Sequence, residues 1–314
     1  MPSAPELTLL QSVSPRYWPS WFGIAILRLV EFLPYRAIMF VGRGLGFLAR
    51  VLVPRYRRIA RRNLELCFPQ LTPQQRDVLV AQQFTALGQA VCESAMSWWS
   101  SDERIRNLST IEGLEHLDKA QKLGCGVILL TAHFTTLEIS ARILCASRPV
   151  CILYKPVRSA VLAAVSNRAR ARRAGSAVRY DEIRGMISAL RKNAVVWYAP
   201  DQSFRKKGAQ MVPFFGIPAA SNVHTSRLAE MTGAPVLYMS HERLPNAAGY
   251  RLTIHAPFTD YPGADAVADV RQLHRRIEAD ATRIPEQYWW IHRRFKGLSA
   301  DYPDYYSKPG LHTP

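Results

Sequence analysis

Short apolar runs alternate with longer amphipathic stretches over the C-terminal two-thirds of the chain. Five such runs, each ending in polar residues, predict buried strands at residues 125–131, 150–154, 194–199, 235–240 and 250–256. Helical periodicity fills the intervals, near residues 136–147, 158–173, 181–192, 222–232 and 264–283. This alternation predicts an α/β fold, with a mainly parallel mixed sheet covered by helices.

Residues 18–62 follow another pattern. The stretch 18–53 is almost all apolar, but charged residues interrupt it, so no clean run reaches the roughly 20 residues of a membrane span. Arg36, Arg43 and Arg50 recur every seven residues and would form one basic stripe on an apolar helix, which is typical of a helix lying in a membrane interface. A buried helical hairpin with arginines that extend to solvent is the alternative.

The segment 50–62 carries six arginines and no acid, which would suit an anionic cytoplasmic leaflet. We therefore expect a membrane-associated helical region with a basic segment at residues 1–62, anchored by a single pass or at the interface. An α/β domain would follow at residues 63–314. Near its start, Thr72-Pro73-Gln74-Gln75 is a capping pattern that predicts a long helix ending near Trp99.

Composition adds a bias in charge. Lys and Arg number 41 against 24 Asp and Glu, a net charge of +17 that favours anionic partners such as nucleic acid, phospholipid head groups or an acidic carrier protein. We expect no nucleic-acid partner, because no helix-turn-helix, RNP or zinc pattern is present and aromatics are not interleaved with the basic run 155–192. The five cysteines show no metal-ligand spacing, which indicates a reducing compartment and no metal site.

Polar residues follow three of the predicted strands. His133 comes after the first strand, Lys155 after the second, and Asp201-Gln202 after the third. Because ligands bind at the carboxyl edge of parallel sheets, we expect a base, a cation and a carboxylate to converge on one crevice.

His133 and Glu138 stand five positions apart in TAHFTTLE. Five residues on a helix rotate side chains by about 140°, so His133 must lie in the turn before the helix. Glu138 could reach back to one imidazole nitrogen and leave the other as a general base. Alternatively, Glu138 could close a capping box with Thr135 as the N-cap. No Ser or Cys lies in a nucleophile motif, so the hydroxyl to be activated would be the substrate's own.

The same residues resemble a known family. HFTTLE is an H-x4-E motif of the glycerolipid-type acyltransferase superfamily, and the chain closely resembles the late acyltransferases of bacterial lipid A biosynthesis, the lauroyl and myristoyl enzymes. The supporting segments are PRYW near the start, RRNLELCFPQ at 61–70, VVWYAPDQ at 195–202, VPFFG at 212–216 and PEQYWWIHRRFK at 285–296. The H-x4-E motif alone is weak evidence, but the set in this order is specific.

The resemblance implies transfer of a fatty acyl chain from an acyl carrier protein thioester to the hydroxyl of a 3-hydroxyacyl chain on a Kdo-bearing lipid A precursor. It implies that His133 and Glu138 are catalytic, that no metal or redox cofactor is needed, and that the enzyme works at the cytoplasmic face of the inner membrane. The partners would be acyl carrier protein, the lipid A precursor and anionic membrane lipids. An enzyme of the same fold acting on another glycolipid, such as a phosphatidylinositol mannoside, is the first alternative. A basic, membrane-attached nucleic-acid-binding protein is the more remote one.

Basic residues dominate the stretch from Lys155 to Lys192, with ten cations against two acids, and could hold phosphates, carboxylates or the acidic carrier. Lys155 stands where the resemblance leads us to expect an arginine, and it could also stabilise an oxyanion. The candidate substrate-binding residues are Lys155, Arg158, Arg170, Arg173, Asp201, Gln202 and Arg293.

Overall fold

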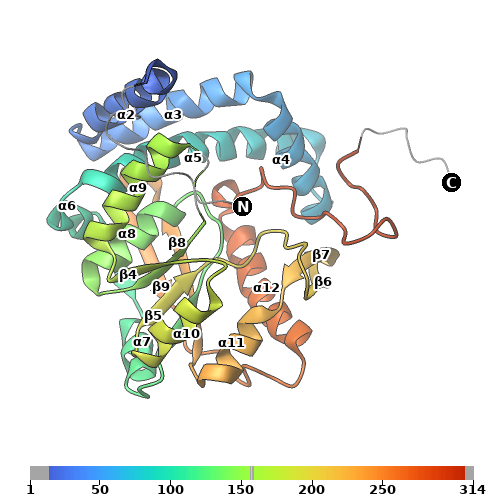
Figure 1. Cartoon of the computed structure of the whole chain (residues 1–314). Coiled ribbons are helices and arrows are strands. Elements are labelled where there is room, and N and C mark those ends of the chain that lie inside the picture. Colours follow the sequence, from blue (N-terminus) through green and yellow to red (C-terminus); the bar gives the residue numbers. More distant parts are fainter. Residues whose placement is uncertain (1–13, 156, 158, 308–314) are drawn as a thin grey trace.

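A seven-stranded sheet forms the centre of the computed structural model, which describes residues 14–155, 157 and 159–307 (Figure 1). The strand order is β1 (Ser109–Glu112), β9 (Tyr250–Ile254), β8 (Val236–Arg243), β2 (Val127–Leu130), β5 (Val195–Tyr198), β3 (Cys151–Tyr154) and β4 (Ser176–Arg179). Every neighbouring pair is parallel except β8 and β9, so the mainly parallel sheet is confirmed. All five predicted strands are present. The pattern missed β1, β4 and a separate hairpin of β6 (Ala209–Phe214) and β7 (Ile217–Asn222).

The sheet is apolar on both faces because helices cover both. Along β2, Ile128 and Leu130 point into one core while Val127 and Leu129 point into the other. The helices that alternate with strands begin and end close to the predicted limits: α8 (Leu137–Ser147), α9 (Ala160–Arg173), α10 (Ile183–Arg191), α11 (His224–Thr232) and α12 (Ala266–Arg283). The described part also contains two short helices, α6 (Asp102–Asn107) and α7 (Leu114–Gln121). It has three 3-10 turns: η1 (Pro15–Tyr17), η2 (Pro245–Ala247) and η3 (Pro285–Gln287).

The chain leaves β2 and β5 in opposite directions. After β2 it passes through α8, on one face, to β3, whereas after β5 it passes through the hairpin and α11, on the other face, to β8. Two adjacent parallel strands whose connections diverge in this way open a crevice between their carboxyl ends. The topology therefore places a binding site just beyond β2 and β5.

The long helices α2 (Trp18–Glu31), α3 (Tyr35–Leu52), α4 (Pro54–Cys67) and α5 (Pro73–Trp99) precede the sheet, and the short α6 joins α5 to β1. The predicted capping box at the start of α5 is confirmed, since the side chains of Thr72 and Gln75 each accept from the other's backbone N–H. Helix α3 crosses α5 closely, because Gly42 and Gly46 face Gly88 with no side chain between the backbones.

The outer surface of α2 and α3 is strongly apolar. Of the 22 exposed large apolar side chains in the described residues, 15 lie between Trp18 and Tyr56. Phe40 and Phe47 on α3 are 75% and 61% exposed, while Ile38 and Met39 on its other face are fully buried. The buried hairpin is therefore wrong for these apolar side chains, whereas the exposure of Arg36 and Arg43 agrees with both patterns.

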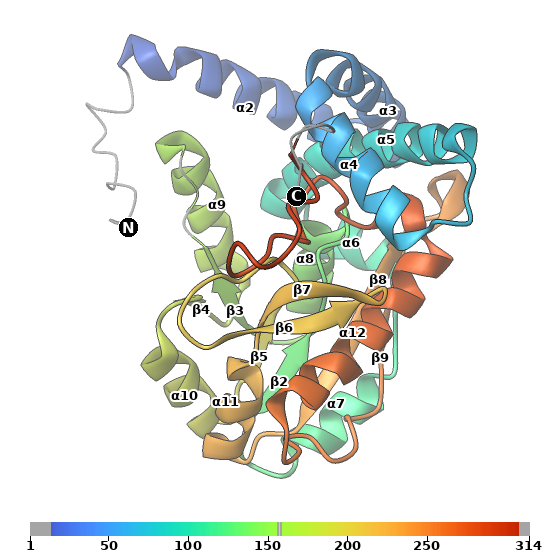
Figure 2. The same cartoon turned by 90° about the vertical axis from the view of Figure 1, so that its right-hand side faces the viewer.

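No single helix among the described residues is both long and apolar enough to cross a bilayer. Helices α3 and α4 satisfy that length and composition only as a pair, and they are bent by 94° relative to one another. Helix α2 is held at its end by Glu31, which pairs with Arg28 and Arg104. In Figure 2, α2 extends outward over α9. The division at residue 62 stays a prediction.

Candidate active site

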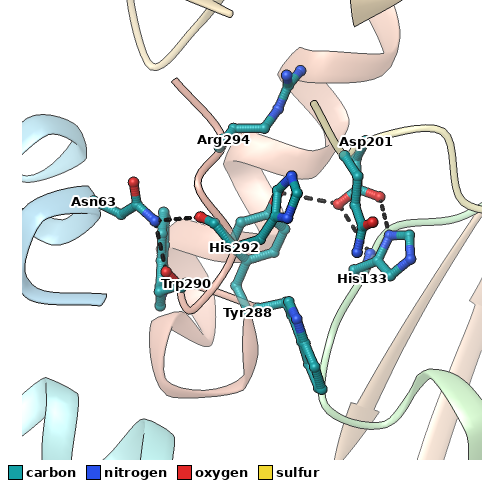
Figure 3. A pocket seen from close by; sticks show the side chains of 9 residues that line it. Asn63, His133, Asp201, Tyr288, Trp290, His292 and Arg294 are labelled. Atoms are coloured by element: carbon teal, nitrogen blue, oxygen red, sulfur yellow. Dashed lines mark hydrogen bonds and ion pairs between the residues drawn. The ribbon is translucent and has the colours of Figure 1, made fainter. Parts of the chain in front are cut away.

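His133 lies in the turn between β2 and α8, as the spacing predicted, and its ring contacts a carboxylate. The Nδ1 atom of His133 lies 2.5 Å from Oδ1 of Asp201, and the His133 backbone N–H donates to Oδ2 of Asp201 at 3.0 Å (Figure 3). Asp201 comes from the loop after β5, the strand next to β2. The His133 side chain is 24% exposed and the Asp201 side chain only 2%, so the carboxylate is buried behind a ring that reaches the surface.

Asp201 is held as an anion. Burial by itself raises the pKa of its carboxyl, but the charge and hydrogen bonds of His133, together with the more distant Arg294 guanidinium, lower that pKa well below its usual range. An ionised carboxylate at Nδ1 keeps the proton on that nitrogen and leaves Nε2 as the basic atom.

The C-terminal segment around η3 fixes both residues. The Trp289 backbone N–H donates to the carbonyl of His133 at 3.0 Å, and Phe134 forms an isolated antiparallel bridge with Tyr288. The buried Tyr288 hydroxyl donates to Oδ2 of Asp201 at 3.1 Å. The Asp201 carboxylate thus has three donors, namely the backbone N–H and Nδ1 of His133 and the Tyr288 hydroxyl, and they orient it toward the imidazole.

The expected capping box at α8 is wrong. The helix begins at Leu137 with Thr136 as its N-cap, and no side chain caps it. The reason is that the Thr135 backbone N–H donates to the carbonyl of Gln287 at 2.7 Å, while the Thr136 hydroxyl contacts Nδ1 of His241 at 2.7 Å. These tertiary contacts outweigh local capping.

The hydrogen bond that Glu138 would accept from the His133 ring is also not formed, because Asp201 occupies that position. Glu138 instead accepts from Nε1 of Trp98 at 3.3 Å and lies 4.0 Å from the Arg170 guanidinium. Glu138 and His133 nevertheless line the same cavity. The carboxylate therefore faces the site without touching the imidazole.

This cavity has a volume of about 200 Å³ and lies between α5, α8, α9 and the ends of β3 and β5. Its apolar lining includes Leu137, Ile152 and Trp197. The cations around it include three of the candidate substrate-binding residues, namely Lys155, Arg170 and Arg173. An apolar wall next to basic groups suits a molecule with a hydrocarbon part and an anionic part.

These cations differ in how far they are already engaged. The Arg173 guanidinium donates to Asp102 at 2.7 Å, so part of its role is structural. Arg170 lies over the Tyr154 ring at 5.4 Å and near Glu138. Lys155 is exposed, and Arg158 lies outside the described residues.

A second, smaller cavity of about 10 Å³, room for roughly one water molecule, lies on the other side of His133. Gln202, His292 and Arg294 line it. Arg293 does not reach this cavity and instead lies over the Tyr306 ring at 5.7 Å. Its neighbour Arg294, which belongs to the WIHRRFK segment of the resemblance, is buried and donates to the carbonyl of Ala220 and the hydroxyl of Ser221.

Within the described ranges, no group of three or more His, Cys, Asp or Glu side chains is arranged as metal ligands. What the site does present is an imidazole paired with a buried carboxylate, beside an amphiphilic cavity at the carboxyl edge of the sheet. The fold and this pair define an α/β protein of general acid–base chemistry.

Comparison with known proteins gives the family. Residues 9–297 match the model of the bacterial lipid A biosynthesis acyltransferases. The chain is 37% identical over 283 residues to a lipid A biosynthesis palmitoleoyltransferase of Escherichia coli, covering 90% of this chain and 92% of that protein. It is 36% identical over 293 residues to the lauroyltransferase of that organism (93% and 96%), and 27% identical over 286 residues to its myristoyltransferase (90% and 88%). The chain belongs to this family and is an acyltransferase of lipid A biosynthesis.

Proposed function

We propose that this enzyme transfers a fatty acyl chain from an acyl carrier protein thioester to the hydroxyl of a hydroxyacyl chain on a Kdo-bearing lipid A precursor. The observation that carries the proposal is the His133–Asp201 pair at the entrance of a cavity with apolar walls and basic groups. The apolar part would receive hydrocarbon, and the cations would hold phosphate or carboxylate.

His133 would act as the base through Nε2. That atom takes the proton of the acceptor hydroxyl while the oxygen attacks the thioester carbonyl carbon. This attack forms the new C–O bond. Collapse of the tetrahedral intermediate restores the carbonyl and breaks the C–S bond, and the imidazolium gives its proton to the leaving thiolate. Asp201 holds the ring and stabilises the imidazolium, and Glu138, across the cavity, adds a second negative charge.

Lys155 and Arg170 would bind the anionic groups of the acceptor or stabilise the oxyanion. The apolar face of α2 and α3, with Arg36 and Arg43 on it, would lie in the inner-membrane interface on the cytoplasmic side. Because α2 contacts α9, and α9 lines the cavity, a lipid acceptor could reach the site from this face.

The direct test is transfer by the purified protein from an acyl carrier protein thioester to a Kdo-bearing lipid A precursor, with products identified by mass spectrometry. We expect one added acyl ester, and lipid A lacking that chain in cells without the gene. Unchanged lipid A together with acylation of another glycolipid, such as a phosphatidylinositol mannoside, would favour the alternative acceptor instead.

A further inference from the structure

A set of lysines and one arginine lies just outside the cavity, at the ends of β3, β4 and β5. Lys155 lines the cavity, and its Nζ lies 6.0 Å from the centre of the Tyr180 ring. Lys206, from the loop after β5, lies 5.1 Å from the same ring and donates to the Tyr180 hydroxyl at 3.1 Å. Arg205 and Lys207 flank Lys206 in the chain and are exposed. We name these four cations and Tyr180 the cationic rim.

The charges of the rim are largely not neutralised. In the described part of the chain, none of the rim's four cations has a salt bridge within 4 Å. Asp181 follows Tyr180 in the chain. Its carboxylate is engaged by Arg179, which donates two hydrogen bonds to it, although Lys206 also contributes to the lowered pKa of that carboxyl. Two ammonium groups held on one ring repel each other, so an incoming anion would lower the energy of the arrangement.

The rim differs from the surface that would face a membrane. The exposed large apolar side chains gather on α2 and α3. Within the described stretch 159–207, which contains most of the rim, just two are exposed, Tyr180 and Ile183. In both views, α9 lies between α3 on one side and β4 and α10 on the other (Figures 1 and 2). A charged, mostly polar surface of this kind fits a soluble acidic partner better than a lipid layer.

We propose that the cationic rim is the docking surface for the acidic acyl carrier protein, which would hold its thioester at the end of a flexible arm. This rests on the proposed function. The carrier would bind at the rim while its arm passes Lys155 into the cavity toward His133, and the lipid acceptor would approach from the side of α2. The two substrates thereby reach one site from two surfaces.

The test is the double variant Lys206→Glu/Lys207→Glu, assayed at low salt with acyl carrier protein as donor. We expect the KM for the carrier to rise about tenfold or more while kcat stays within about twofold, and the salt dependence of the wild-type KM to weaken in the variant. With an acyl-pantetheine thioester, an uncharged donor that has neither carrier protein nor phosphate, the KM should not change. Lys119→Glu/Lys122→Glu is the matched control, because α7 precedes β2 and so lies at the opposite edge of the sheet.

Thermal melting of each variant checks that it is folded. An unchanged carrier KM overturns the docking surface, and so does a rise confined to the KM of the lipid acceptor, which would mean that the rim binds acceptor anions. Wild-type protein that takes acyl chains from acyl-pantetheine but none from the carrier overturns both the docking surface and the carrier as donor. If the wild type takes acyl chains from the carrier and the Lys206→Glu/Lys207→Glu variant has the same carrier KM, the docking surface alone is overturned.

Discussion

His133 and Asp201 lie 68 positions apart in the chain, yet their side chains are joined at 2.5 Å because β2 and β5 are adjacent and parallel. The pair is therefore a product of topology. Since Asp201 also accepts the backbone N–H of His133 and the hydroxyl of Tyr288, its carboxylate is fixed before any substrate binds.

Asp201→Asn tests the pair. The amide keeps the size of the side chain but loses the charge, and its NH₂ group would favour the wrong tautomer of His133, so kcat should fall by about 10²- to 10⁴-fold. His133→Ala should be at least as damaging. The double variant should be little worse than either single one, because residues that act as a unit are not additive.

The readout is acyl transfer at saturating substrate, with thermal melting alongside. Tyr288→Phe is the companion variant, since it removes one hydrogen bond to Asp201 and keeps the charge. A smaller loss of kcat is expected there than in Asp201→Asn. Equal losses in the two variants, or near-normal turnover in folded Asp201→Asn protein, would contradict the assignment of Asp201 as the partner of His133.

Glu138→Gln separates charge from structure at the second carboxylate. Glu138 makes no capping hydrogen bond in α8, so its replacement by glutamine should leave the melting temperature nearly unchanged. If its charge stabilises the imidazolium across the cavity, kcat should fall on the order of 10²-fold. Turnover close to wild type would instead assign Glu138 to the positioning of Trp98 and Arg170.

The sequence pattern was sufficient for the five strands β2, β3, β5, β8 and β9 and for the active edge of the sheet, because buried parallel strands are short continuous apolar runs and their ends are marked by polar residues. It placed His133, Lys155 and Asp201 at one edge. It could not assign the partner of His133, because Glu138 is near in sequence whereas Asp201 is near only after β5 pairs with β2. The role of Tyr288 depends on the return of the C-terminal segment beside Phe134, which no local pattern encodes.

The crossing of α3 and α5 gives a prediction about stability. A Cβ at Gly88 would overlap the carbonyl oxygen of Gly42 and the backbone nitrogen of Gly46, so Gly88→Ala should lower the melting temperature and expose α3 to protease. Gly44→Ala is the control, since Gly44 lies in α3 between Gly42 and Gly46, yet a Cβ there would have nothing within 4 Å. It should be neutral or stabilising by up to about 1 kcal/mol. Equal behaviour of the two variants would mean that the helices do not cross here.

Phe47→Ser tests the apolar surface. Loss of a side chain that inserts into lipid costs about 1.5–3 kcal/mol, so binding to vesicles that contain phosphatidylglycerol should weaken about tenfold or more. Met231→Ser removes a similarly exposed apolar side chain at the end of α11 and should leave binding unchanged. Flotation with vesicles measures both. If the two variants float with the vesicles to the same extent, α3 is not a membrane-binding element.

Two buried histidines predict how stability depends on pH. Burial lowers the pKa of His274 to about 3, helped by the Arg294 guanidinium, and burial lowers the pKa of His241 to about 4, both from an ordinary 6.5. Between pH 6.5 and 4 the unfolded chain protonates these rings and the folded protein does not. The free energy of unfolding should therefore decrease as the pH is lowered below 6.5, by about 1.4 kcal/mol per pH unit for each histidine.

His274→Gln should remove one such contribution. Glutamine can still donate to the carbonyl of Pro213 and accept from Arg294, as His274 does, but it does not titrate. Urea unfolding measured from pH 8 to pH 4.5 should give the variant a shallower pH dependence below pH 6.5, by about 1.4 kcal/mol per unit. At pH 8 both rings are neutral in both states, so any difference there reports packing alone. Parallel curves for the wild type and the variant below pH 6.5 would show that His274 is protonated in the folded enzyme.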